Sequence, residues 1–174
     1  ALHKQCLSQR RLRDKFSTAR SPKAWLEWAD CQRARLSAEK ALVGYSGGSS
    51  TMMLELTRDA CLLTLLTGMT PDRVGVYRLL KLGGSLKRGE GGDFQIDLSE
   101  PGAHKTAAAF GPSCTTVTTH VAERISQLVD KDNLVAGEYL FHGADRRTAF
   151  SPAAWTQLVK AAFLAHSGVA LCPK

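Results

Sequence analysis

Lysine and arginine side chains are the residues of this sequence whose type and positions point to a chemical role, namely contact with phosphate groups. The first forty residues hold ten Lys and Arg against four Asp and Glu, so they carry +6 of the formal net charge of +7. A basic segment beside a nearly neutral remainder is typical of a chain that lies along a polyanion, because each phosphate contact releases condensed counterions. A solvated helix face is the alternative interpretation. The candidate phosphate contacts are Arg10, Arg11, Arg13, Lys15, Arg20 and Lys23.

A further basic candidate, Lys105, stands alone. It lies in EPGAHKTAAAFGPSCTT, residues 100–116, where Glu100 is the only other side chain with a formal charge. The Pro101-Gly102 pair indicates a turn, so Lys105 is predicted to lie at or just after that turn. The segment by itself leaves open whether the lysine has a partner or is a solvated turn residue.

The common local motifs of nucleotide, zinc and serine-hydrolase chemistry are missing. The chain has no GxxxxGK[ST], GxGxxG, HExxH or GxSxG pattern and no EF-hand loop. Its five histidines are dispersed, and a lone histidine is more often a surface or core residue than a ligand. Five cysteines without a CxxC pair indicate reduced thiols. We therefore expect no metal and no cofactor.

The overall composition is that of a globular chain that can bury a core. Of its 174 residues, 44% are hydrophobic and 22% are charged. No apolar run reaches the roughly 18 residues of a membrane span, and the basic N-terminus lacks the apolar segment of a signal peptide. We expect no membrane partner, and a nuclear or cytoplasmic protein.

The elements that must position these residues begin with a helical segment over residues 4–43. Ser21 as N-cap and Pro22 at the first helical position predict a helix whose irregular apolar face includes two tryptophans. Packing in a helix core is favoured over stacking on a sugar or base. The segment GYSGGSS (44–50) predicts a hinge, and therefore a basic helical arm over 1–50 and a second unit over 51–174. The apolar face is Trp25, Trp28, Ala29, Ala34 and Leu36.

Two consecutive helices follow the hinge. Apolar residues from Met52 to Leu66 recur at three- and four-residue steps and predict a buried amphipathic helix that ends at Gly68. TPDRVGVYRLLKL then predicts a helix capped by Thr70, with Tyr77 among its inward residues.

The remainder mixes strands and helices. GGSLKRGEGG (83–92) predicts a loop, DFQIDLS (93–99) a half-buried strand, and AAAF with SCTTVT further short strands. A helix capped by Thr118 or Thr119, a buried extended EYLFH segment (138–142), and a helix from Ser151 to Gly168 complete the chain. The predicted fold class is α+β, mostly helical, with a helix bundle and a small antiparallel β-sheet.

The order of these motifs along the chain is similar to that of a known protein family. An apolar helix ending in TGMTPDR, the helix VGVYRLLKL, a short strand, HKT at a strand turn, LFH, and the helix SPAAWTQLVKAAFLAHSG follow one another. This order resembles the first half of the catalytic domain of tyrosine recombinases, the phage-integrase family. The wording of EPGAHKTAAAFGPSCTT and of SPAAWTQLVKAAFLAHSGVALCPK is most similar to divergent eukaryotic, especially algal, mobile-element recombinases. The resemblance covers residues 51–174 and rests on order and spacing.

The resemblance implies a reaction on double-stranded DNA. In that family a tyrosine attacks a phosphodiester and forms a 3′-phosphotyrosyl link, and a hairpin lysine protonates the departing 5′ oxygen. Two arginines and a His or Lys stabilise the pentacoordinate phosphate, since charge builds up on its non-bridging oxygens. No metal is required. DNA integration and recombination, and a homo-oligomer on the DNA, are the implied activity and assembly.

Two residues of this sequence match the family pattern at catalytic positions. Lys105 matches the hairpin lysine. Thr70 occupies the usual position of the first arginine in TGMTPDR, but Arg73 lies one helical turn later and shares a helix face with that position. The resemblance thus implies Arg73 and Lys105 as catalytic residues, and a surface arginine at a helix start is the alternative for Arg73.

The remaining family machinery is not found in the sequence given. The HxxR box and the nucleophilic tyrosine would follow SGVALCPK, which ends at Lys174, and Tyr45, Tyr77 and Tyr139 do not match the nucleophile's position. We therefore expect a partial catalytic domain, truncated before the nucleophile and inactive alone. The alternative hypothesis is a non-catalytic helical interaction module in which Lys105 is a solvated turn residue.

Overall fold

The computed structural model describes residues 26–69, 74–89, 91–100 and 112–171. Helices and one small antiparallel sheet make up these residues, which confirms the α+β class. The elements are α2 (Trp28–Val43), α3 (Ser50–Gly68), α4 (Val74–Arg78), β1 (Leu86–Arg88), β2 (Phe94–Asp97), β3 (Cys114–Thr116), α6 (Thr119–Asp132) and α7 (Pro152–Ser167).

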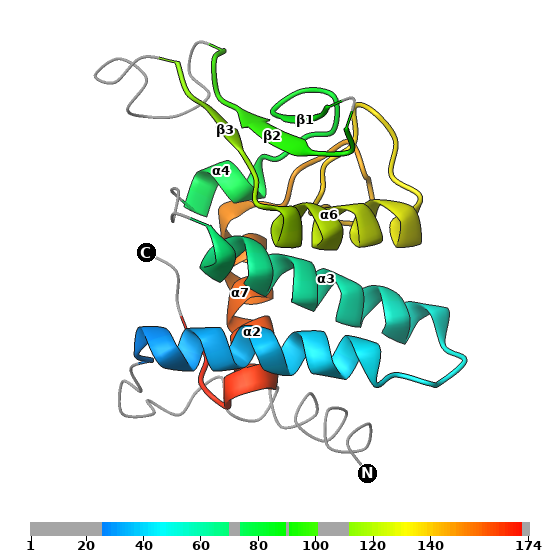
Figure 1. The fold of residues 1–174 in the computed structure, drawn as a ribbon. Coiled ribbons are helices and arrows are strands. Elements are labelled where there is room, and N and C mark those ends of the chain that lie inside the picture. Colours follow the sequence, from blue (N-terminus) through cyan, green and yellow to red (C-terminus); the bar gives the residue numbers. More distant parts are fainter. Residues whose placement is uncertain (1–25, 70–73, 90, 101–111, 172–174) are drawn as a thin grey trace.

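Helix α3 is the centre of the bundle. It packs against α2, α6 and α7, and α2 also packs against α7 (Figure 1). The sheet lies beyond α6, on the side away from α2. Buried side chains from all four long helices and from the sheet form one hydrophobic cluster. The described part of residues 1–50 therefore shares its core with the described part of 51–174, and the predicted division at residue 50 stays a prediction.

The extent of α3 confirms the predicted buried helix. Ser49 is the N-cap, and its hydroxyl accepts a hydrogen bond from the Met52 N–H at 3.3 Å. The second half of α3 is buried on every face rather than along one stripe, because three helices surround it. Even polar side chains are enclosed there: Thr57, Asp59, Thr64 and Thr67.

The start of α2 corrects the predicted N-terminal helix. Leu26 and Glu27 are not helical, and Glu27 is the N-cap, with φ −71° and ψ 160°. Its backbone N–H donates to the Asp30 carboxylate at 3.0 Å in a capping box. Because of this local cap, α2 begins at Trp28. The predicted cap at Ser21 lies outside the described residues.

The buried face of α2 consists of small side chains. Cys31, Ala34 and Ala38 are buried, so the helix can approach its neighbours closely. Trp28 is 56% exposed and Leu36 is 54% exposed. The expectation that the tryptophans of this helix pack in its core is therefore wrong for Trp28. The face of α2 that packs against the other helices is the one with small side chains, and Trp28 lies outside it.

The sheet has the order β1-β2-β3 and is antiparallel throughout. Ile96 pairs with Leu86 of β1 and with Thr115 of β3. Phe94, Ile96 and Leu98 are buried, as the predicted half-buried strand requires. Strand β1 corrects the loop predicted for 83–92: one buried residue, Leu86, anchors a short strand between glycine-rich turns.

Helix α4 is shorter than predicted. It ends at Arg78, and the chain then runs extended beside the EYLFH segment. The Leu80 carbonyl accepts from the Leu140 N–H at 2.9 Å, and the Leu82 N–H donates to the Glu138 carbonyl at 2.9 Å. Tyr77, at 1% exposure, is buried as predicted, and Leu140 confirms the buried extended segment.

The last two helices begin at their predicted caps, and α7 also confirms its predicted bounds. Thr118 is the N-cap of α6. Ser151 caps α7 by accepting from the Ala154 N–H at 3.2 Å, and Gly168 ends α7 with a φ of 77°, a left-handed conformation that favours glycine. Among the residues with a described placement, no helix combines the length and apolarity that crossing a bilayer requires.

Candidate functional site

The catalytic and DNA-binding residues predicted from the sequence lie outside the part of the chain that the structure describes. Arg73 falls in the segment 70–73 and Lys105 in the segment 101–111. The same holds for the six basic candidates of the N-terminal segment: Arg10, Arg11, Arg13, Lys15, Arg20 and Lys23. Their roles stay predictions, and the described residues around them supply the geometry that follows.

The segment with Arg73 follows the end of α3 that packs beside the start of α6, whereas the length of β3 separates the segment with Lys105 from that helix. The segment with Arg73 follows the C-terminal end of α3, where a Cβ on Gly68 would lie 3.3 Å from Cγ2 of Val121 in α6. The segment with Lys105 joins β2 to β3, and β3 leads directly into α6. Figure 1 shows the end of α3 and the start of α6 on the same side of the bundle.

The base of the β2–β3 connection is held by several hydrogen bonds. The Leu98 N–H donates to the Ser113 carbonyl at 2.7 Å. The Asp97 carboxylate accepts from Lys87 Nζ at 2.6 Å and from the Ser99 N–H at 2.9 Å, and the Ser99 hydroxyl also donates to it. The hydrogen bond from Lys87, followed by those from Ser99, holds the pKa of Asp97 below its usual range.

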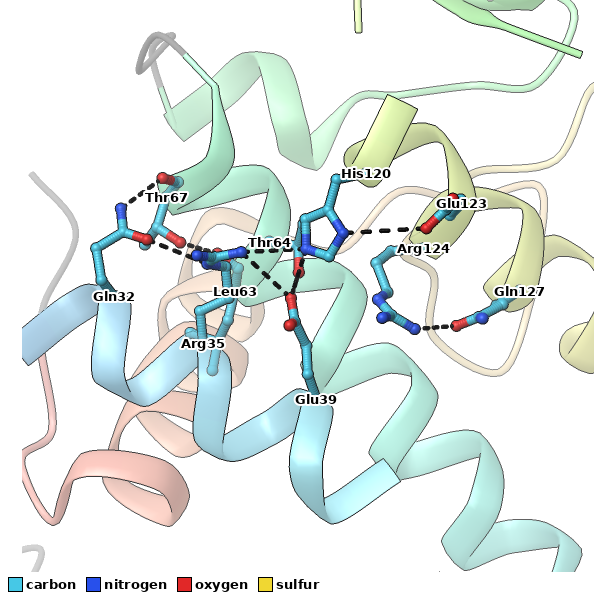
Figure 2. A network of polar contacts seen from close by, with 10 residues as sticks. All are labelled: Gln32, Arg35, Glu39, Leu63, Thr64, Thr67, His120, Glu123, Arg124 and Gln127. Carbon is cyan, nitrogen blue, oxygen red and sulfur yellow. Dashed lines mark hydrogen bonds and ion pairs between the residues drawn. The ribbon is translucent and has the colours of Figure 1, made fainter. Parts of the chain in front are cut away.

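The densest polar site of the described residues joins α2, α3 and α6 (Figure 2). Glu39 of α2 is its centre: one carboxylate oxygen contacts His120 Nε2 at 2.7 Å, Thr64 Oγ1 at 3.1 Å and Arg35 Nη1 at 3.5 Å. The Glu39 side chain is only 14% exposed. Burial opposes its ionisation, but the hydrogen bonds from His120 and Thr64 outweigh burial and lower the pKa of Glu39.

His120 contacts two members of this network that have opposite hydrogen-bonding roles. Its Nε2 lies 2.7 Å from the Glu39 carboxylate, which only accepts, and 3.1 Å from Arg35 Nη1, which only donates. One nitrogen cannot donate to the first and accept from the second at the same time. The shorter, charge-assisted bond to Glu39 favours a proton on Nε2, and the ring's Nδ1 then faces Glu123 at 4.0 Å.

Further hydrogen bonds join α2 to the C-terminal end of α3. Gln32 Nε2 donates to the Thr67 carbonyl at 2.8 Å, and Gln32 Oε1 accepts from Arg35 Nε at 3.1 Å. These bonds tie α2 to the last turn of α3, immediately before the segment that carries Arg73. Contacts from α2 and α6 therefore hold the end of α3, which is the described residue stretch before that segment.

A second cluster fastens the end of α6 to the loop before α7. The Asp132 carboxylate contacts His142 Nε2 at 2.8 Å and Arg146 Nη2 at 3.0 Å, and both Asp132 and His142 are largely buried. His142 Nδ1 lies 2.7 Å from the Gly143 carbonyl. Within the described ranges, no group of His, Cys, Asp and Glu has a geometry that could hold a metal ion. We call the contacts of Asp132 with His142 and Arg146, which join the end of α6 to the loop before α7, the clasp.

Sequence reasoning missed both clusters. Glu39 and His120 lie 81 residues apart, and no local spacing connects them. The one usable signal was the position of His120 in the first turn of α6, directly after the Thr118 cap. Such a signal locates a residue at a helix start but does not identify its partner.

The chain matches no protein-family description, no curated protein and no solved structure.

Proposed function

We propose that this chain is a DNA-binding domain of the tyrosine recombinase type that takes part in DNA integration and recombination. Arg73 and Lys105 would contact the phosphate at which the strand is cut, and the basic N-terminal segment would contact the duplex nearby. The nucleophilic tyrosine would come from outside the residues given. The chain alone therefore binds DNA without cutting it.

The observation that carries the proposal is the uneven charge of the sequence, since +6 of the +7 lies in the first forty residues. A basic segment of this kind suits a partner with many phosphates, because each phosphate contact releases counterions. The two catalytic candidates come from separate connections, one after α3 and one between β2 and β3, and the proposal requires both to reach one phosphate.

The test is the salt dependence of duplex binding. We expect the logarithm of affinity to fall steeply with the logarithm of salt concentration, because phosphate contacts release counterions. Replacing Arg10, Arg11 and Arg13 with alanine lowers that slope. A charge-matched control, R33A/R88A/R147A, removes three exposed arginines of the described surface and has a smaller effect.

Absent or salt-independent binding by the wild-type chain contradicts the proposal. That result would favour the second candidate function, a helical interaction module. The exposed apolar side chains of α2 support this alternative, since Trp28, Leu36 and Val43 are 56%, 54% and 80% exposed. The two candidates thus give opposite results in one titration.

A further inference from the structure

Arg124 of α6 lies in a cleft formed by α2, α3 and α6, and within the described residues it has no carboxylate partner. Its Nη1 donates to Gln127 Oε1 at 2.7 Å, while its buried Nε has no hydrogen-bond partner in the part of the chain that the structure describes. Among the residues that the structure describes, no carboxylate oxygen lies within 4.0 Å of its guanidinium. A partly buried charge that lacks an ionic partner is costly, so a partner group is expected to reach it.

The cleft around Arg124 has apolar walls. It encloses about 420 Å³ and is lined by residues of three helices. Leu42 and Val43 come from the end of α2 and Met53 from α3, while Gln127 and Lys131 of α6 complete the rim. Val43, the last residue of α2, is 80% exposed and offers apolar surface beside the cleft. The guanidinium of Arg124 lies between α6 and α3 in Figure 2.

A second hollow continues the first. It encloses about 340 Å³ beside the Gly47–Ser50 turn and includes Leu54. Met53 and Lys131 line both hollows, so the two form one elongated groove along the first half of α3. An elongated open groove with apolar walls suits several consecutive residues of a peptide better than a compact ligand.

We propose that this groove, which we call the Arg124 groove, binds an acidic, apolar peptide segment of a partner protein. A carboxylate of the segment pairs with the guanidinium of Arg124, and neighbouring apolar side chains cover Val43 and Met53. Arginine's planar fork matches a carboxylate in two parallel hydrogen bonds, for which the terminal nitrogens of Arg124 are the accessible donors because Nε is buried.

The charges of the groove favour a carboxylate over nucleic acid. Arg124 and Lys131 face one acid, Asp130, so the groove has a small positive excess. A duplex would need several phosphate contacts on a polar surface, whereas the walls here are Leu42, Val43 and Met53. The groove lies at the opposite end of α3 from the segment that carries Arg73, so this inference is independent of the proposed function.

The experiment uses two matched peptides, acetyl-Leu-Leu-Glu-Leu-Leu-amide and the same peptide with Gln in place of Glu. Binding to the full 174-residue chain is measured by titration while the Arg124 Nε–H resonance is followed by NMR. We expect the Glu peptide to shift that resonance and to bind at least about tenfold more tightly than the Gln peptide, because a charge-assisted pair is formed. R124Q abolishes this preference, and R124K retains part of it.

Controls separate the pairing from folding and from net charge. R147Q removes the same charge from an exposed position and keeps the peptide preference. R124Q is expected to fold, since it removes a charge without a counter-ion. The proposal is overturned if neither peptide binds, if both bind equally, or if R124Q keeps the preference. Displacement of the Glu peptide by equimolar inorganic phosphate or duplex DNA would identify a phosphate site instead and also overturns it.

Discussion

Removal of the Glu39 carboxylate is expected to weaken the junction of α2, α3 and α6. In E39A the Thr64 hydroxyl, which is fully buried, loses the acceptor that lies 3.1 Å away. An unsatisfied buried hydroxyl costs about 1–3 kcal/mol. The lost bond to His120 adds about 0–1 kcal/mol, because that imidazole is 39% exposed and partly screened. We therefore expect E39A to lower the free energy of unfolding by about 1–4 kcal/mol.

The conservative variant separates the acceptor from its charge. In E39Q the side-chain carbonyl still accepts from Thr64, so the loss is about 1 kcal/mol near neutral pH. The folded-state pKa of Glu39 is lowered, so its stabilisation is complete above the ordinary value of 4.5 and is lost as pH falls through the lower folded value. The difference between wild type and E39Q should therefore shrink as the pH falls below 4.5.

Urea unfolding followed by circular dichroism measures both effects. A double-mutant cycle of E39A and T64V isolates the coupling between the two side chains, and we expect about 1 kcal/mol or more. S37A is a matched control on the exposed face of α2. A loss in E39A no larger than in S37A, or additive effects in the cycle, would refute the assignment of Glu39 as the centre of the network.

Substitutions at three further positions test the packing and the loop contacts of the fold. W155A should lower the free energy of unfolding by about 3–5 kcal/mol, because Trp155 is buried and its ring meets that of Phe141 edge to face at 5.3 Å between centroids. W155F should cost less, since the indole N–H has no hydrogen-bond partner among the described residues. G168A should cost about 1 kcal/mol in the same urea assay through its left-handed φ of 77°. D132A should speed proteolytic cleavage in residues 133–150 by releasing His142, and unchanged cleavage would contradict the clasp.

The predictable parts of the fold carried their signals locally. For α7, Ser151 before Pro152, an apolar stripe and a terminal Gly168 specify start, face and stop within one segment, and all of them were found. Strand β1 lacked such a signal, because only Leu86 of its three residues is buried. It becomes a strand through pairing with β2.

The parts that could not be predicted depend on distant partners. Which face of α2 is buried is decided by α3 and α7, which accept Ala34 and Ala38 and leave Trp28 in solvent. The Glu39–His120 contact joins elements that only the bundle brings together. Local patterns therefore predicted helices and caps, whereas the polar sites needed the tertiary arrangement.

The central claim is that Arg73 and Lys105 contact the phosphate backbone of duplex DNA. The most direct measurement compares the salt dependence of duplex affinity for R73A, K105A and the control R147A in the full chain. The account predicts that R73A and K105A each weaken binding and reduce the salt slope by about 1, while circular dichroism shows all three variants folded. Affinities and slopes of R73A and K105A that equal those of R147A would contradict it.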